Sequence, residues 1–288
     1  MKIEKFKVSE NSKLNLKSHQ TDFTGDYQDK KVAESDLSQN VKKLSELQDT
    51  LYAENKQSLL VIFQAMDAAG KDGAIKHIFS GVNPQGVHVA SFKQPSSEEL
   101  DHDFLWRCSK NLPERGRIGV FNRSYYEEVL IVRVHNAILQ SQPLPDAVKI
   151  GKNIWKERFE AIRTFENYLS NNGVHIIKFF LNVSKEEQKK RFLSRIEEPD
   201  KNWKFSATDA KERGFWDDYM KVYEEAIAAT STAIAPWFVI PADKKWFART
   251  AISEIIVNKL ETINPQFPQV SKAQRESLLE AKRILESE

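Results

Sequence analysis

The chain has 288 residues, a formal net charge of +2, 29% charged residues and one cysteine. This length is enough for one domain with additions or for two small domains. The near-neutral charge argues against a dedicated nucleic-acid binder, and a single cysteine excludes an internal disulfide framework. The first ten residues lack the hydrophobic region of a signal peptide, and no apolar run approaches the roughly 20 residues that span a bilayer, so we expect a cytoplasmic globular protein with no membrane partner.

In chain order, residues 1–35 are polar and aperiodic, and we expect an arm rather than a domain. Apolar residues then recur at helical spacing, so an amphipathic helix is predicted over 36–56. Leu59 to Phe63 form a continuous apolar run, which is typical of a strand buried on both faces. The same reasoning predicts further strands at 87–92, 116–121, 175–181 and 237–240.

Helical patterns separate these strands. We expect helices from the capping-box pair Ser96 and Glu99 to before Pro113, and over about 153–170, 184–198, 209–229 and 247–263. The alternation predicts an α/β fold, a P-loop kinase-like three-layer sandwich with a five-stranded, mostly parallel sheet that binds ligands at the carboxyl ends of its strands. The main domain should cover 36–263, and the tail 264–288 should form an amphipathic helix that serves as an oligomer contact or a packing strap.

The stretch after the first predicted strand has the layout of a phosphate cradle. A small-residue loop ends in Gly70-Lys71-Asp72-Gly73, and a helical pattern begins at once. Backbone N–H groups at a helix N-terminus bind phosphate oxygens, and a lysine adds a mobile positive charge. We therefore expect Lys71 to act in catalysis, with Ala69, Gly70, Asp72 and Gly73 binding phosphate. The alternative is a tight strand-to-helix turn without a ligand.

The loop departs from the pattern G-x-x-x-x-G-K-[ST] at two positions. Ala65 replaces the first glycine, and Asp72 replaces the Ser or Thr whose hydroxyl normally holds magnesium. The loop also contains Asp67, and an acid inside an anion site is costly unless a cation lies between them. We therefore predict that Asp67 is the metal ligand and holds Mg²⁺ against the phosphates.

The third predicted strand leads into Asn122-Arg123, where P-loop proteins usually place a magnesium-associated aspartate. Asn122 is neutral, which shifts metal binding further onto Asp67. Arg123 should point into the same crevice and clamp a phosphate in catalysis. The alternative is a surface arginine paired with Glu127 or Glu128.

The predicted helix over 184–198 is strongly basic. Arg191 and Arg195 are four residues apart and share one of its faces. In a kinase fold, a basic helix between the fourth and fifth strands is where a lid closes over donor phosphates. We expect a lid over about 184–210 in which Arg191, Arg195 and Lys204 bind phosphate, with Trp203 at its hinge. The alternative is a solvated charged face.

Six segments together carry a specific pattern: MDAAGKDG (66–73), FKQP (92–95), DFLWR (103–107), FNRSYYE (121–127), WKF (203–205) and APW (235–237). They resemble the second family of polyphosphate kinases over roughly residues 35–262. That family consists of P-loop kinases that move a phosphoryl group between inorganic polyphosphate and nucleotides with magnesium. The resemblance implies that Asp67 and Lys71 are the loop's acid and lysine, and that Arg123 is the arginine of the second motif.

The resemblance also implies nucleotide contacts from Asn122, Tyr126 and Glu127 and a phosphate contact from Arg133. The second motif, with Tyr125 between Asn122 and Glu127, is similar to the branch that phosphorylates both nucleoside mono- and diphosphates. Other branches tend to carry Asp-Arg-Ser-Trp-Tyr-Asn there.

The expected activity is reversible, direct in-line transfer from polyphosphate to AMP and ADP, ending in ATP, with GMP and GDP as further candidate acceptors. Mg²⁺ is the expected cofactor and Mn²⁺ a substitute. Because polyphosphate is a uniform polyanion, a tunnel lined by cations would suffice to bind it. A homo-oligomer, either a dimer or a tetramer, is also expected. Two alternatives are a conventional ATP-dependent nucleoside monophosphate kinase and a nucleotide-binding switch without turnover.

Overall fold

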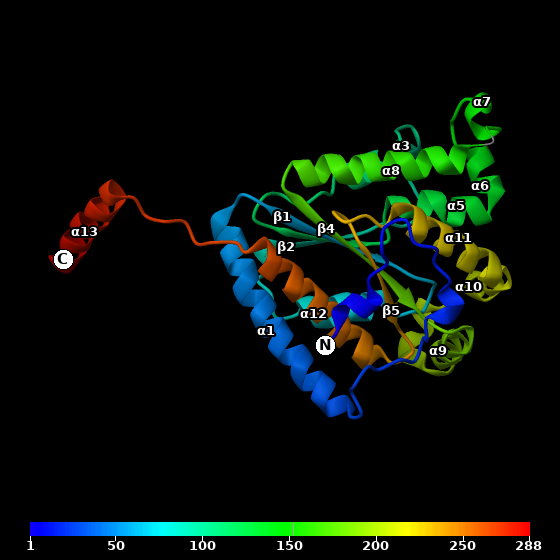
Figure 1. The fold of residues 1–288 in the computed structure, drawn as a ribbon, viewed down its shortest axis with the longest axis horizontal. Helices are drawn as coiled ribbons and strands as arrows, with labels where there is room; N and C mark the ends of the chain where they lie inside the picture. The colour runs from blue at the N-terminus through cyan, green and yellow to red at the C-terminus, as the bar shows by residue number, and fades with distance from the viewer. Residues whose placement is uncertain (152) are drawn as a thin grey trace.

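The computed structural model describes residues 1–151 and 153–288, which are organised around a five-stranded sheet (Figure 1). Neighbouring strands are all parallel, in the order β2-β3-β1-β4-β5. The strands are β1 (Ser58–Gln64), β2 (Val87–Ser91), β3 (Ile118–Asn122), β4 (Val174–Asn182) and β5 (Trp237–Pro241). The predicted strands are confirmed, and the sheet is wholly parallel.

β1 lies at the centre of the sheet, between β3 and β4, and all seven of its residues are buried. Its apolar run, Leu59 to Phe63, has no exposed surface. Burying each such side chain contributes roughly 1.5–3 kcal/mol, which explains why a run without polar alternation forms the middle strand of a covered sheet.

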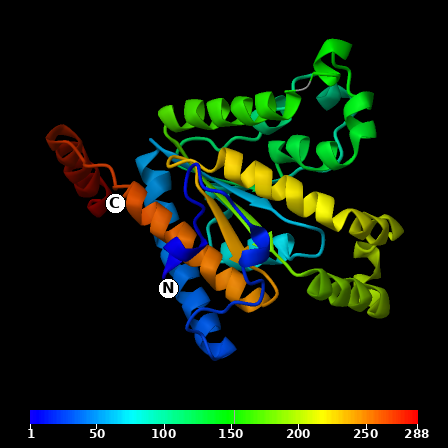
Figure 2. The same cartoon turned by 45° about the vertical axis from the view of Figure 1, so that its right-hand side comes forward.

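Helices cover both faces of the sheet, as the three-layer prediction requires (Figure 1, Figure 2). On one face lie α1 (Lys30–Glu54), α2 (Lys71–Phe79) and α12 (Lys245–Ile263). On the other lie α8 (Ile154–Asn171) and α11 (Trp216–Thr230). None of the described helices combines the length and the hydropathy that crossing a bilayer requires.

The remaining helices lie in connections and in the tail. They are α3 (Ser97–Leu100), α4 (Trp106–Ser109), α5 (Ile131–Val134), α6 (Asn136–Ser141), α7 (Asp146–Lys149), α9 (Lys185–Glu197), α10 (Ala207–Glu212) and α13 (Lys272–Glu286). Short 3₁₀ segments are η1 (Ile3–Phe6), η2 (Leu16–Ser18), η3 (Pro84–Gly86), η4 (Tyr125–Val129), η5 (Pro199–Lys204) and η6 (Arg213–Phe215).

Two predicted helices are interrupted. The helix expected from Ser96 keeps its capping box but ends at Leu100, because the Asp103 carboxylate accepts a hydrogen bond from the Leu105 N–H and starts a separate turn before α4. The helix expected over 209–229 is divided at η6, which contains Gly214, a residue that weakens helices by its backbone freedom.

The first 35 residues are part of the main body, which corrects the expectation of a separate arm. Phe6, Val8 and Leu16 are buried in the core. The Val8 N–H donates to the Trp237 carbonyl at 2.8 Å, so this segment covers the β5 edge of the sheet. α1 also begins at Lys30, earlier than predicted, because the Asp29 side chain caps it.

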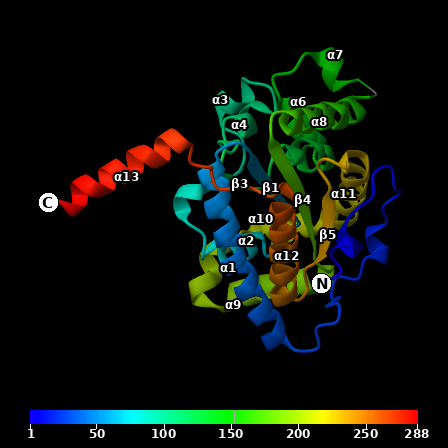
Figure 3. The same cartoon turned by 60° about the vertical axis from the view of Figure 1, so that its left-hand side comes forward.

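The predicted helix in the tail is confirmed as α13, which projects away from the body at the end of an extended segment (Figure 3). Ser271 and Gln274 form its capping box. Its apolar residues Leu278, Leu279 and Leu285 are more than half exposed. The expected role of this helix as an oligomer contact or a strap stays a prediction.

Candidate active site

A cleft of about 1030 Å³ opens beside the carboxyl ends of β1, β2 and β3. Among the described residues that line it, ten are Lys or Arg and four are Asp or Glu. The excess of positive charge in a concave site focuses the field and attracts polyanions. The cations are Lys71, Lys76, Lys93, Arg123, Lys190, Arg191, Arg195, Lys201, Lys245 and Arg249.

The loop between β1 and α2 forms the floor of this cleft. Ala68 and Gly70 have φ angles of 58° and 109°, so the backbone turns sharply through the left-handed region before α2 begins at Lys71. Gly70 is the N-cap of α2, and the first N–H groups of a helix have no partners within it. The predicted phosphate residues Ala69, Gly70, Asp72 and Gly73 all line the cleft here.

Lys71 is buried at the start of α2, and its Nζ donates to the Ala65 carbonyl at 2.9 Å. Burial lowers the pKa of Lys71 to about 8, and the neighbouring charge of Arg123 adds to this effect, while Asp67 and other acids oppose it. The ammonium group is therefore still mainly charged at neutral pH. It is held against the loop, where it can reach bound phosphate.

Arg123 lies directly against the loop because the β1–β3 register pairs Phe63 with Asn122. Its N–H donates to the Phe63 carbonyl at 3.0 Å, and its Nη2 donates to Asp67 Oδ1 at 2.8 Å. Burial alone would lower the pKa of Arg123, but the carboxylates of Glu127 and Asp67 raise it. Arg123 therefore lines the cleft and is ion-paired with Asp67, and its expected role as a phosphate clamp stays a prediction.

Asp67 supplies a carboxylate on the cleft wall, with its side chain about a third exposed at 36%. No group of three or more His, Cys, Asp or Glu side chains in the described part of the chain could enclose a metal ion. A Mg²⁺ site made by one or two carboxylates together with substrate phosphates fits this arrangement. Asp209 is the second candidate carboxylate, because its pKa is raised by burial and then by the negative charge of nearby Asp67.

Asn122 and Asp72 meet at the cleft wall, where Asn122 Nδ2 donates to Asp72 Oδ1 at 2.7 Å. Asp72, which stands at the usual Ser or Thr position of the loop, therefore contacts Asn122, which stands where P-loop proteins usually place an aspartate. The amide fixes the carboxylate that stands at the usual Ser or Thr position.

A smaller cavity of about 80 Å³ adjoins the cleft and shares Asp67, Arg123 and Asp209 with it. Glu127 lines this cavity together with Tyr223. Burial raises the pKa of Glu127, and the positive charges of Arg123 and Lys71 oppose that shift. The predicted nucleotide residues Asn122 and Glu127 thus line different cavities, the cleft and the smaller cavity, and Arg123 lines both.

Arg191 belongs to α9 and is buried against the loop between β1 and α2 and against the segment after β5. Its Nε donates to Glu187, Nη1 to the carbonyls of Ala68 and Ala69 at 3.0 and 2.7 Å, and Nη2 to the carbonyls of Ala242 and Asp243. All five guanidinium N–H groups are matched to protein acceptors. Arg191 therefore holds the loop, and a direct phosphate contact would require it to release a carbonyl.

The rest of the predicted lid is placed at the cleft as well. Arg195 lines the cleft and lies 4.0 Å from Asp209. Trp203 lies at the rim, with 78% of its surface exposed. The side chain of Lys204 is outside the described part of the structure, so its phosphate contact stays a prediction.

Two predicted contacts are corrected. Tyr126 has no exposed surface, and its hydroxyl donates to Glu166 inside the core, so it does not face either cavity. Arg133 is ion-paired with Glu225 and stacks on Trp155, and it lines neither the cleft nor the smaller cavity. Both contacts were expected from the family resemblance, and the structure turns both side chains away from the cavities.

Several cleft residues were missed by the sequence reasoning, notably Lys93, Asp209, Lys245 and Arg249. Lys93 lies two residues after the end of β2, and Lys245 begins α12 just after β5. The rule that ligands bind at the carboxyl ends of parallel strands could have identified these two. Asp209 and Arg249 lie on helices without a local signal.

Comparisons with known proteins agree with this geometry. The sequence model of the family "Polyphosphate kinase 2" matches residues 27–268. The chain is 51% identical over 285 residues to an "ADP-polyphosphate phosphotransferase" of Rhodopseudomonas palustris, covering 99% of both chains. It is 42% identical over 279 residues to an "AMP/ADP-polyphosphate phosphotransferase" of Meiothermus ruber, covering 96% of this chain and all of that one.

The fold is also that of a solved relative. The crystal structure of polyphosphate kinase 2 from Arthrobacter aurescens superposes with a TM-score of 0.86 at 40% identity and covers 96% of each chain. The loop between β1 and α2, the charged cleft and these similarities lead to one conclusion: this chain belongs to the polyphosphate kinase 2 family and is a kinase.

Proposed function

We propose that this protein transfers phosphoryl groups from inorganic polyphosphate to AMP and ADP, in a reversible reaction that ends in ATP. The observation that carries the proposal is the cleft in which ten cations surround a phosphate loop, because a chain of phosphates offers no other feature to recognise. Two full-length relatives whose names specify ADP and AMP/ADP as acceptors support the choice of nucleotides. GMP and GDP are further candidate acceptors.

The proposed mechanism is direct and in line. The terminal phosphate oxygen of the acceptor attacks the terminal phosphorus of polyphosphate, a new P–O bond forms, and the bond to the chain breaks with the leaving oxygen becoming the end of the shortened chain. Because one phosphoanhydride replaces another, no protein nucleophile is needed. The chain's own task is to position the two anions and to neutralise the charge between them.

Named residues divide this task. The N–H groups at the start of α2 and the ammonium of Lys71 bind phosphate oxygens, and Arg123, which lies against the same loop, neutralises the migrating group. Asp67 would hold Mg²⁺ (or Mn²⁺), with Asp209 as a second carboxylate. When bound, the ion would neutralise phosphate charge as a Lewis acid. Arg195 lies where it can approach a bound polyanion from the lid side.

A coupled luminescence assay tests the function. Purified protein is supplied with Mg²⁺, polyphosphate and either AMP or ADP, and ATP is recorded. We expect ATP from both acceptors. ATP from ADP alone would limit the proposal to diphosphates, and transfer from ATP to nucleoside monophosphates without use of polyphosphate would favour a conventional kinase. Nucleotide binding without any turnover would favour a switch.

An acid-to-amide pair tests the role of Asp67. Asp67→Asn should reduce Mg²⁺-dependent kcat by about 10²-fold or more, because the amide cannot balance the cation's charge. Asp217→Asn, which changes an exposed acid of α11 outside the cleft, is the matched control and should keep wild-type activity. Full Mg²⁺-dependent activity in Asp67→Asn would remove this residue from the proposed site.

The proposal extends to assembly and location. The exposed apolar residues of α13 favour a homo-oligomer of two or four chains, which light scattering of the full chain would reveal as a multiple of the monomer mass. A cytoplasmic location fits the one free thiol, Cys108, which is buried and whose pKa burial raises to about 12.

A further inference from the structure

Two ion pairs in the described part of the chain have both side chains less than a tenth exposed. Lys178 and Glu166 are 0% and 1% exposed, and Arg158 and Glu128 are 8% and 6% exposed. Both pairs hold the same short stretch of chain, residues 124–128, which follows Arg123 and is called the anchored segment below. The cleft mechanism makes no use of either pair.

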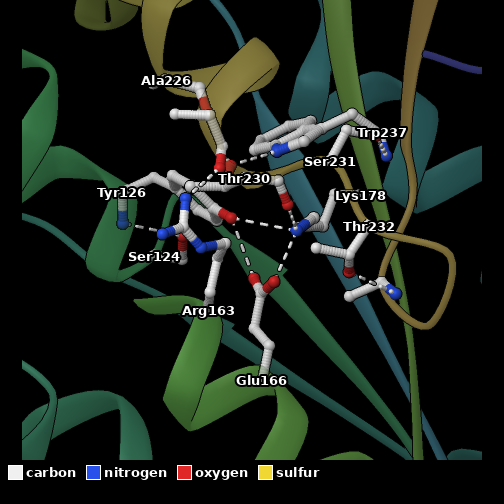
Figure 4. A network of polar contacts seen from close by, with 12 residues as sticks. Ser124, Tyr126, Arg163, Glu166, Lys178, Ala226, Thr230, Ser231, Thr232 and Trp237 are labelled. Carbon is white, nitrogen blue, oxygen red and sulfur yellow. Dashed lines mark hydrogen bonds and ion pairs between the residues drawn. The ribbon is translucent and has the colours of Figure 1, made fainter. Parts of the chain in front are cut away.

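The first pair lies next to Tyr126 of the anchored segment (Figure 4). Lys178 on β4 donates to Glu166 Oε2 at 2.6 Å, to the Tyr126 hydroxyl at 3.0 Å and to the Thr230 carbonyl at 2.8 Å. Tyr125 and Tyr126 each donate to Glu166 Oε1 at 2.9 Å. Every ammonium hydrogen is used, so the network fixes both tyrosines to β4 and α8.

The second pair holds the other end of the anchored segment. Arg158 on α8 donates through Nη1 to the Glu128 carbonyl at 2.7 Å and to its carboxylate at 3.2 Å. Gln142 completes the network, since it accepts from Arg158 Nη2 and donates to Glu128, both at 2.7 Å. Backbone and side chain are therefore both tied to α8.

Stability alone does not account for this construction. Replacing a buried ion pair by apolar side chains of similar volume is often neutral or stabilising, so a core of this size could be built without the charges. Two cleft residues depend on the position of the anchored segment: Arg123, which directly precedes it and is bonded to Asp67, and Glu127, which belongs to it and lines the smaller cavity. Arg123 also has a φ of 65°, a conformation that persists in a non-glycine residue only where its surroundings enforce it.

We propose that the two buried ion pairs form a positioning device for the cleft. They fix the anchored segment to β4 and α8, so that Arg123 and Glu127 keep the orientation that phosphoryl transfer requires. Glu166, Lys178, Glu128 and Arg158 are therefore positioning residues, which act through Arg123 and Glu127 and touch no substrate. This inference rests on the proposed function only for its kinetic test.

The kinetic test neutralises the first pair without changing its size. Glu166→Gln/Lys178→Met should fold with a Tm near that of the wild type, because no unpaired charge is left behind. Its kcat should fall by about 10- to 100-fold with little change in KM, since displacing a catalytic group by about 1 Å costs that much. Tyr126→Phe, which removes one hydroxyl and keeps the ring, should show a smaller loss of the same kind.

A buried polar side chain elsewhere provides the matched control. Gln48 on α1 is fully buried without a hydrogen-bond partner for its amide and lines neither cavity. Gln48→Met should keep wild-type kcat and an equal or higher Tm. A fall in kcat in Gln48→Met as large as in the pair variant would mean that any change in the core disturbs the cleft, and would overturn the proposal.

A double-mutant cycle then asks whether the pair acts through Arg123. In an Arg123→Lys background, the pair substitution should lower kcat by much less than it does in the wild type, because the group to be positioned is already changed. A merely structural role would cost the same factor in both backgrounds. That outcome, or an unchanged kcat in the pair variant, would refute the proposal.

Hydrogen exchange gives a readout that needs no activity. Amides of residues 123–128 should exchange faster in the pair variant, while those of β1 and β4 stay protected. Unchanged exchange of 123–128 would overturn the proposal even if the protein proved inactive on polyphosphate. Failure of the proposed function itself would appear instead as an inactive wild type.

Discussion

Lys71 combines a buried position with a charge that the mechanism needs. Its folded pKa of about 8 lies below the ordinary value of 10.5 because burial, aided by Arg123, disfavours the ammonium. A lowered folded pKa means that burying the charge costs stability at all pH values below about 8, and that this cost is relieved as the pH rises towards the unfolded value. As the pH rises above about 8, the stability cost of burying Lys71 therefore decreases, while the ability of Lys71 to bind phosphate as a cation is lost.

The activity should accordingly fall on the alkaline side. We expect kcat/KM for ADP to decrease above about pH 8 in the free enzyme, since deprotonated Lys71 cannot bind phosphate as a cation. Steady-state kinetics between about pH 6.5 and 9.5 measure this. Lys71→Arg, which stays charged over that range, should lose the alkaline decrease whatever its absolute rate. The same decrease in Lys71→Arg would assign the titration to another group.

Helix α9 is joined to the phosphate loop at its base, which limits how it can act as a lid. Gln188 donates to the Asp67 carbonyl at 2.9 Å, and Arg191 binds the Ala68 and Ala69 carbonyls. Closure over donor phosphates therefore has to come from the part beyond Arg191, which includes Arg195 and η5. The predicted lid and its hinge at Trp203 stay predictions.

Replacing Arg191 should lower both the stability of the protein and its catalytic rate. Arg191→Lys leaves several buried carbonyls without donors, so we expect the free energy of unfolding to fall by about 2–4 kcal/mol and kcat to fall as the loop loosens. Urea denaturation and steady-state kinetics measure the two effects. Lys190→Ala, on the same helix and also at the cleft, should leave stability unchanged. A raised KM for polyphosphate in Arg191→Lys, with stability intact, would show that Arg191 is a phosphate ligand instead.

The whole cleft is assembled from distant parts of the chain, and its charge is a collective property. Lys71, Lys93, Arg195 and Arg249 come from four different elements or connections and share one cavity. A long polyanion would contact many of these cations at once, whereas a nucleotide contacts few. The two substrates should therefore respond differently to salt.

We expect KM for long-chain polyphosphate to rise steeply with KCl, and KM for ADP to rise much less, because binding a polyanion releases its condensed counterions. Arg249→Ala should reduce the salt dependence for polyphosphate while leaving that for ADP nearly unchanged. Initial rates at several KCl concentrations decide the matter. Equal salt dependence for both substrates would argue that polyphosphate does not occupy the length of the cleft.

Local pattern was sufficient for much of the fold and for the centre of the site. The apolar run of β1 and the glycine-lysine turn after it can each be recognised from a few consecutive residues, and both are confirmed. The assignment of Asp67, Lys71 and Arg123 to one crevice also followed from the sequence, since parallel strands bring their carboxyl ends together.

Contacts between distant residues could be decided only by the tertiary structure. A 3.6-residue period shows that a helix has an apolar face, but it does not show which residues that face contacts. The carbonyl partners of Arg191 could therefore not be predicted from the sequence. The same holds for the strand order and for the packing of residues 1–35 on β5. Tyr126 stands three residues from Arg123, yet one faces the core and the other the cleft. The Tyr126 hydroxyl is held in the core by Glu166 on α8 and Lys178 on β4, whose ion pair joins elements that are separate in the sequence.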